Sequence, residues 1–128
     1  MAIEHIRLSQ PAKDQLVKLK RLTGIENWNV LCRWAFCISL SEQSAPPTVK
    51  IPADSNVEMS WKVFGGRYAD IYMALLKERC IRDGFSVDTE NLTQQFRLHL
   101  HRGISYLAGN KSLRSIRDLV SLAVQAAQ

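Results

Sequence analysis

Residues 4–24, EHIRLSQPAKDQLVKLKRLTG, set the start of the fold. Polar and apolar residues alternate over residues 4–8, which predicts a short strand. Ser9 is a typical helix N-cap, and the proline two positions later fits the first helical turn, where its missing N–H costs nothing. A helix is therefore predicted over residues 10–22, and Gly24 is expected to end it in the left-handed conformation.

The predicted helix has one apolar side and one cationic side. With about 100° of rotation per residue, the apolar side consists of Ala12, Leu16, Leu19 and Leu22. The opposite side carries Lys13, Lys18, Lys20 and Arg21. Asp14 is the only acidic residue of this helix, so we expect its exposed surface to be positively charged.

The next helix, predicted over residues 27–40, is apolar nearly all round. Such a helix must be covered on every side, which a chain of 128 residues achieves poorly alone. We therefore expect an oligomer that buries this helix at a subunit interface. Arg33 is the single charge of the helix and needs a carboxylate or a carbonyl as its partner; Asp70 and Glu78 are the carboxylate candidates.

The middle of the chain predicts an extended connection followed by a helix. Three prolines make residues 44–56 an extended surface segment, flanked by short strands at residues 48–51 and 61–64. The helix that follows is predicted over residues 67–83. Its apolar stripe consists of Tyr68, Ile71, Tyr72, Leu75, Leu76 and Cys80.

Two further helices are predicted in the last third of the chain. One covers residues 89–108, where Gly103 indicates close backbone packing and Arg97 and Arg102 lie outside the core stripe. The last helix is expected to begin with Lys111, Arg114 and Arg117, which would share one face as a second cationic surface. The predicted fold is thus mostly α, a bundle of about five helices with a short N-terminal strand, a ribbon-helix-helix-like start, and minor strands in the middle.

The composition favours one compact unit with an anionic partner. A hydrophobic content of 46% suits a single domain spanning residues 1–128, and neither a secretory signal nor a membrane span is evident, so we expect a soluble, cytoplasmic protein. Seventeen Lys and Arg against twelve Asp and Glu give a net charge of +5. The basic excess lies in the first and last 40 residues, so the terminal segments are expected to form any anion-binding surface.

Motifs for catalysis and cofactor binding are missing from the sequence. Neither of the glycine-rich phosphate-binding patterns, GxxxxGK[ST] or GxGxxG, occurs. His99 and His101 are about 200° apart on a helix, so they cannot share a metal ion. Cys32, Cys37 and Cys80 have apolar surroundings and are expected to be reduced thiols in the core. We therefore expect a protein that is not an enzyme and holds neither a metal nor a cofactor.

The run IRLSQPAKDQLVKLKRLTGIENWNVLCRWAFCISLSE, residues 6–42, resembles the DndE family of DNA sulfur-modification proteins. The likeness continues through VFGGRYADIYMALLKERC, residues 63–80, and through the helical C-terminal half. The resemblance implies a role in bacterial DNA phosphorothioation, in which sulfur replaces a non-bridging phosphate oxygen. It also implies a small helical protein that forms tetramers and binds duplex DNA, nicked duplex in particular, through surface lysines.

The resemblance implies a lysine-rich DNA-binding surface, and helical periodicity matches it in this sequence to Lys13, Lys18 and Lys20, with Arg21 beside them. Arg7 and the second cationic surface, Lys111, Arg114 and Arg117, complete the set of candidate DNA contacts. The implied protein partners are a cysteine desulfurase, an iron–sulfur protein and an ATPase of the modification system. An oligomer would repeat these cations on one assembly, which lets them neutralise several phosphates without contacting bases.

Three other hypotheses remain open from the sequence. An N-terminal strand followed by two helices also matches a sequence-specific ribbon-helix-helix repressor, in which His5 and Arg7 would enter the major groove. A structural adaptor would hold the modification enzymes together and touch DNA only incidentally. A sulfur relay would use one of the three cysteines, and it ranks last because apolar surroundings raise the pKa of a thiol and hide it.

Overall fold

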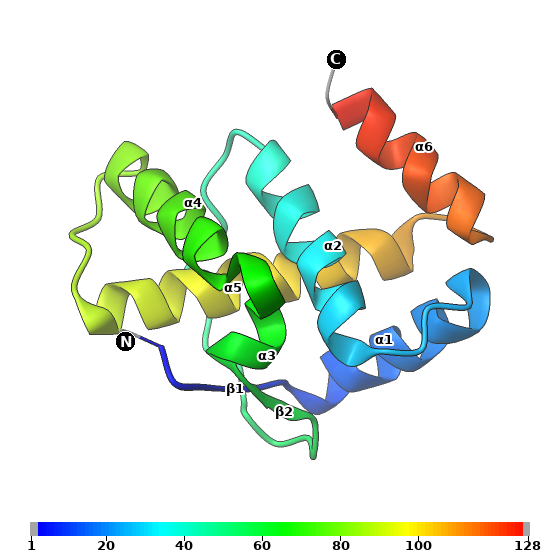
Figure 1. Cartoon of the computed structure of the whole chain (residues 1–128), viewed down its shortest axis with the longest axis horizontal. Coiled ribbons are helices and arrows are strands. Elements are labelled where there is room, and N and C mark those ends of the chain that lie inside the picture. The colour runs from blue at the N-terminus through cyan, green and yellow to red at the C-terminus, as the bar shows by residue number, and fades with distance from the viewer. Residues whose placement is uncertain (1–2, 127–128) are drawn as a thin grey trace.

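The computed structural model describes residues 3–126, which form a mostly helical structure (Figure 1). Helix α5 crosses behind α2, with α4 at one end of the molecule and α1 and α6 at the other. In chain order the elements are β1 (His5–Arg7), α1 (Gln10–Thr23), α2 (Trp28–Ser41), β2 (Glu58–Ser60), α3 (Trp61–Gly65), the short 3-10 helix η1 (Gly66–Tyr68), α4 (Ala69–Arg82), α5 (Thr89–Gly109) and α6 (Ile116–Ala126). The predicted mostly α fold with a short N-terminal strand is confirmed.

Strand β1 forms a two-stranded antiparallel sheet with β2 of the same chain. The register pairs His5 with Ser60 and Arg7 with Glu58. The expected strands at residues 48–51 and 61–64 were wrong, because the first segment has no regular structure and the second is helical. The physical reason at residues 61–64 is local: the Ser60 side chain accepts a hydrogen bond from the Val63 N–H, which caps a helix where a strand was expected.

Helix α1 follows its sequence signals closely. The Ser9 hydroxyl accepts a hydrogen bond from the Ala12 N–H at 3.2 Å, as expected of an N-cap. Gly24 has φ of 76°, and its N–H donates to the Lys20 carbonyl, which ends the helix in the predicted way. Of the predicted apolar side, Leu16 and Leu19 are fully buried.

The core is centred on the crossing of α2 and α5. A Cβ atom placed on Gly103 of α5 would lie 1.7 Å from the carbonyl oxygen of Ala35 in α2, so the two backbones are in direct contact there. Beside this crossing an aromatic cluster fills the space between α2, α3 and α5. Its members are Phe36, Trp61, Phe64 and Phe96, with ring centroids of neighbouring pairs 4.9–5.7 Å apart.

Part of the predicted α4 stripe lies on the surface instead of in the core. Leu76 and Cys80 are buried, but Tyr68, Ile71 and Leu75 are exposed. The rest of the chain packs against only one side of this apolar stripe, so the residues on its other side remain exposed to solvent.

Helix α6 begins later than predicted. Residues 110–115 form a turn, so Lys111 and Arg114 precede the helix and the three basic residues do not share one helical face. The N-terminal signal that sets the start is Ser115, whose backbone carbonyl and hydroxyl both bond to the Asp118 N–H. Leu119 is buried against the body, whereas Val120 and Val124 are exposed.

Three arginines hold the extended segment that connects α2 to β2. Arg79 donates to the carbonyls of Leu40, Gln43 and Ser44, and Arg102 donates to those of Ser39 and Ser44. Arg97 donates to the carbonyls of Arg7, Ile51 and Pro52. Because backbone carbonyls need hydrogen-bond partners, these side chains supply the donors that a neighbouring strand would provide in a sheet.

Arg33 uses the carbonyl alternative and neither of the two carboxylates considered for it. Its guanidinium donates to the carbonyls of Val63 and Phe64 at the end of α3. Neither carboxylate pairs with Arg33, and Glu78 forms a salt bridge with Arg82 at 2.9 Å.

Within residues 3–126 no helix combines the length and the apolar character that a membrane crossing requires.

Candidate nucleic-acid interface

The first two candidate cations, Arg7 and Lys13, lie beside the two-stranded sheet and are already engaged. Arg7 forms a salt bridge with Glu58 across the strand pair, with 2.7 Å between Nη2 and Oε2. The Lys13 ammonium donates to the side-chain carbonyl of Asn56 at 2.6 Å. A phosphate would have to compete with these contacts, so this end of α1 offers little free charge.

Lys18 and Lys20 also make intramolecular contacts. The Lys18 ammonium donates to the carbonyl oxygen of Ala108 at 2.8 Å, near the C-terminus of α5. Lys20 lies over the ring of Trp28 in a cation–π geometry, with its nitrogen 3.9 Å from the ring centroid.

Four cations remain without such contacts. Among the residues that the structure describes, no salt bridge and no side-chain hydrogen bond is formed by Arg21, Lys111, Arg114 or Arg117. All four side chains are exposed. They come from two segments that are about 90 residues apart in the sequence, the end of α1 and the stretch from the α5–α6 turn into α6.

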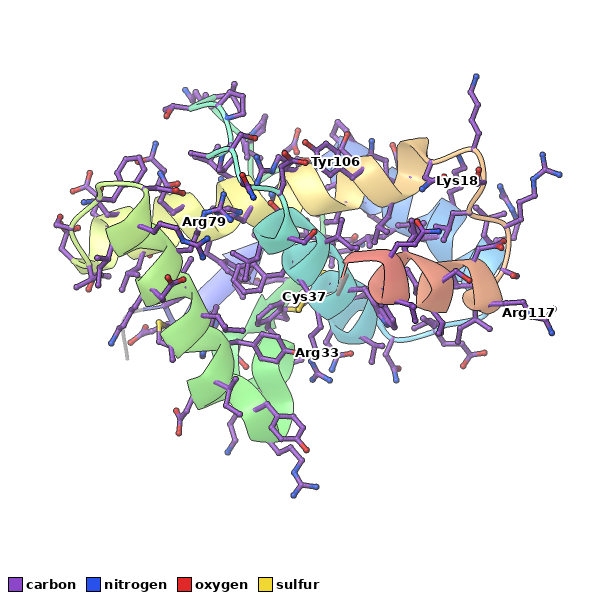
Figure 2. The ribbon with its side chains drawn as sticks, turned by 90° about the horizontal axis from the view of Figure 1, so that it is seen from above. Lys18, Arg33, Cys37, Arg79, Tyr106 and Arg117 are labelled. Carbon is purple, nitrogen blue, oxygen red and sulfur yellow. The ribbon has the colours of Figure 1, made fainter. Side chains whose placement is uncertain are left out.

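The fold brings these two segments to the same end of the molecule. Helix α6 packs against α1, and Lys18 bonds to the last turn of α5, from which the α5–α6 turn starts. Figure 2 shows Lys18 and Arg117 at this end, away from Arg33. We call this surface the basic end; its residues are Lys18, Arg21, Lys111, Arg114 and Arg117.

The acidic residue Asp118, near the basic end, makes hydrogen bonds within its own segment. The Asp118 carboxylate accepts from the backbone N–H of Arg114 at 2.9 Å and lies beside the hydroxyl of Ser115, so it stabilises the start of α6. The arrangement is a set of exposed cations on two neighbouring segments, which suits contact with a row of phosphates.

Sequence reasoning found the residues of the basic end but not their grouping. It placed Lys13 and Lys20 with the other cations of α1, and it predicted a helical stripe for Lys111, Arg114 and Arg117. The signal that could have corrected the second point was Ser115 followed three residues later by Asp118, a helix-start pattern.

The cysteines differ more than expected. Cys32 and Cys80 are buried, and burial raises the pKa of the Cys32 thiol to about 12. Cys37 is exposed on the outer side of α2, so the prediction of a core thiol was wrong for this residue. The structure contains no group of three or more His, Cys, Asp or Glu side chains within residues 3–126 that could hold a metal ion.

Two histidines of α5 are held in hydrogen-bond networks. The Ser39 hydroxyl accepts from Arg102 Nε and is hydrogen-bonded to Nδ1 of His99 at 2.8 Å. Burial, assisted by the charges of Arg79 and Arg102, lowers the pKa of His99 to about 4. His101 accepts from the Ser9 N–H and bonds to the Arg97 carbonyl, which makes it part of the α1–α5 packing.

An apolar surface covers the outer side of α2 and α4. Val30, Trp34 and Cys37 of α2 line a hollow of about 310 Å³ together with Arg33 and Tyr72. The exposed residues Tyr68 of η1 and Ile71 and Leu75 of α4 extend this surface. We call it the α2/α4 surface; the predicted all-round apolar helix therefore stays partly uncovered in the single chain.

Comparison with protein families gives a match over residues 5–115 to the family described as DNA sulphur modification protein DndE. The chain belongs to the DndE family. The family match ends in the α5–α6 turn, so α6 lies beyond it.

Solved DndE structures share this fold. The crystal structure of DndE from Escherichia coli B7A, described as involved in DNA phosphorothioation modification, is 25% identical and superposes with a TM-score of 0.69, covering 84% of this chain and 98% of the other. A DndE variant with two glycines replaced by lysine, also described as involved in DNA phosphorothioation, is 22% identical with a TM-score of 0.64 and the same coverage. The search of curated proteins finds no match. DndE proteins are components of DNA phosphorothioation systems, which confirms the predicted family.

Proposed function

We propose that this DndE protein is the non-catalytic DNA-binding component of its phosphorothioation system and binds duplex DNA, preferentially nicked duplex, through the basic end. The observation that carries the proposal is the grouping of four uncontacted cations from two distant segments: Arg21, Lys111, Arg114 and Arg117. Exposed cations without intramolecular partners repel one another, and an anionic partner relieves that repulsion. Binding partners in the system would be the cysteine desulfurase, the iron–sulfur protein and the ATPase.

The mechanism of binding would be electrostatic and independent of sequence. Each phosphate that a lysine or arginine neutralises releases condensed counterions, so the logarithm of the binding constant falls with the logarithm of the salt concentration by about 0.9 per phosphate. A nick makes the duplex more flexible, which lowers the cost of fitting it to a rigid charged surface. Nicked duplex should therefore bind more tightly than intact duplex.

Oligomerisation, expected to give a tetramer, would multiply these contacts. The α2/α4 surface supports this part of the proposal, because one chain leaves the large apolar side chains of Ile71 and Leu75 exposed and that of Trp34 only partly buried. An assembly formed through the α4 side of this surface would leave the basic end free, since α4 lies at the opposite end of the molecule from α1 and α6 (Figure 1).

The repressor hypothesis loses support from the strand pairing. A ribbon-helix-helix protein pairs its first strand with that of a second copy, whereas β1 here pairs with β2 of the same chain. Arg7, which would have read bases, is bound to Glu58.

Binding can be measured by fluorescence anisotropy with intact duplex, nicked duplex and single strands of equal length and sequence, across a series of salt concentrations. We expect the order nicked, then intact, then single-stranded, with a steep salt dependence. The double variant Arg114→Gln/Arg117→Gln should flatten the salt slope by about 1.8 for each subunit in contact with DNA. The matched control Lys62→Gln/Lys77→Gln removes two exposed charges of α3 and α4 and should bind like the wild type.

Three results would contradict the proposal. An equal loss of DNA affinity in the basic-end variant and in the control would show that net charge alone determines binding. Strong preference for one sequence among unrelated duplexes would favour a repressor. Unchanged DNA modification in cells that carry a basic-end variant with no measurable DNA affinity would favour the adaptor.

A further inference from the structure

Lys18 differs from the other cations of the basic end in what it contacts. Its ammonium lies 2.8 Å from the carbonyl oxygen of Ala108, one of the last four carbonyls of α5, which lack a helical N–H partner. A cation at this position also interacts favourably with the negative end of the helix dipole. The contact joins two elements that are 90 residues apart in the sequence.

The segment after Ala108 carries three of the four uncontacted cations of the basic end. Lys111 follows it by three residues, and Arg114 and Arg117 come from the same turn and the start of α6. The buried side chain of Leu113 anchors the turn, and local bonds hold its backbone: the Leu113 N–H donates to the Asn110 carbonyl, the Ser112 N–H to the Asn110 side chain and the Arg114 N–H to Asp118. Within the described residues, the Lys18–Ala108 contact is the one hydrogen bond that ties α1 to the end of α5, where the turn starts.

We propose that Lys18 is a positioning residue that fixes the α5–α6 turn beside α1 and so joins the two halves of the basic end into one DNA-binding surface. The proposal rests on the proposed function for its effect on DNA, but the contact itself can be tested without DNA. Its consequence is that losing Lys18 costs more than one charge, because Lys111, Arg114 and Arg117 then no longer align with Arg21.

The test compares Lys18→Met with Arg21→Gln, which removes one cation of the same helix that has no intramolecular contact. Methionine and lysine have nearly equal helix propensity, so the variant keeps α1. In anisotropy titrations with nicked duplex, Arg21→Gln should flatten the salt slope by about 0.9 for each subunit in contact, and Lys18→Met by at least twice as much. Lys18→Arg, which keeps the charge and can still donate to Ala108, should restore most of the wild-type slope.

Hydrogen exchange on the DNA-free protein provides the independent readout. Amides of residues 110–113 should exchange faster in Lys18→Met than in the wild type, Lys18→Arg or Arg21→Gln. A slope change equal to that of Arg21→Gln, or unchanged exchange in the turn, would overturn the positioning role. If the wild type itself shows no salt-dependent DNA binding, the proposed function fails, while the exchange data still decide whether Lys18 holds the turn.

Discussion

Replacing Gly103 by alanine tests the closest contact of the fold. The added Cβ would lie 1.7 Å from the carbonyl oxygen, 2.4 Å from the carbonyl carbon and 2.9 Å from the Cα of Ala35. All three are backbone atoms of α2, so no side chain can rotate away to make room. The helices must separate by well over an ångström, which opens gaps in the aromatic cluster beside the crossing.

The expected magnitude follows from two opposing effects. Alanine stabilises a helix by about 1 kcal/mol relative to glycine. Overpacking of a core costs about 1–3 kcal/mol when side chains can adjust, and a backbone clash of this size belongs at or above the upper end. We expect a net loss of at least about 2 kcal/mol in the free energy of unfolding, or roughly 8 °C in melting temperature for a chain of this size.

Urea and thermal unfolding, followed by circular dichroism, measure this loss. Gly109→Ala is the matched control, because it lies on the same helix and a Cβ there meets nothing within 4 Å. The control should change stability by less than about 1 kcal/mol. A Gly103→Ala protein as stable as the control would refute the close crossing of α2 and α5.

Three further predictions concern buried polar groups. The pKa of His99 is lowered to about 4, so between about pH 6.5 and pH 4 the unfolded chain binds a proton that the folded chain does not. The free energy of unfolding should therefore fall by up to roughly 3 kcal/mol as the pH is lowered through this range. Urea titrations of His99→Gln should show a shallower pH dependence than those of the wild type. Arg79→Met leaves the Asp83 carboxylate and three backbone carbonyls without their donor, so it should lower the free energy of unfolding by about 3–5 kcal/mol. The control Arg82→Met removes an exposed ion pair and should lower it by less than about 0.5 kcal/mol in the same unfolding assay. Thiol labelling at pH 8, mapped by mass spectrometry, should leave Cys32 unmodified in the folded protein, and rapid labelling there would contradict its burial.

The sequence predicted those elements whose signals are local. Ser9 and Gly24 mark both ends of α1, and Gly103 marks the close crossing, because in each case one residue determines the backbone conformation or the approach. The strand partner of β1 could not be predicted, since pairing depends on which distant segment reaches it. The short segment at residues 61–64 was misassigned because a few aromatic residues fit a strand or a helix equally well.

The candidate site was predicted as a list of residues but not as a surface. Helical periodicity shows which side of α1 is polar, but it cannot show that Lys18 meets Ala108 or that Lys20 stacks on Trp28. Such contacts depend on tertiary structure, and they decide which cations remain free. The same limit applies to α4, where periodicity identified apolar residues such as Ile71 without revealing that the chain leaves them exposed.

The arginines that hold the segment between α2 and β2 constrain how this sequence can diverge. Arg79 and Arg102 each reach several carbonyls with one planar group, which the single ammonium of a lysine cannot do, so an exchange that preserves charge would still lose the path of the segment. The exposed side chains of the segment itself contribute little to holding this path. Substitutions within this stretch should therefore disturb its path less than substitutions of the arginines that hold it.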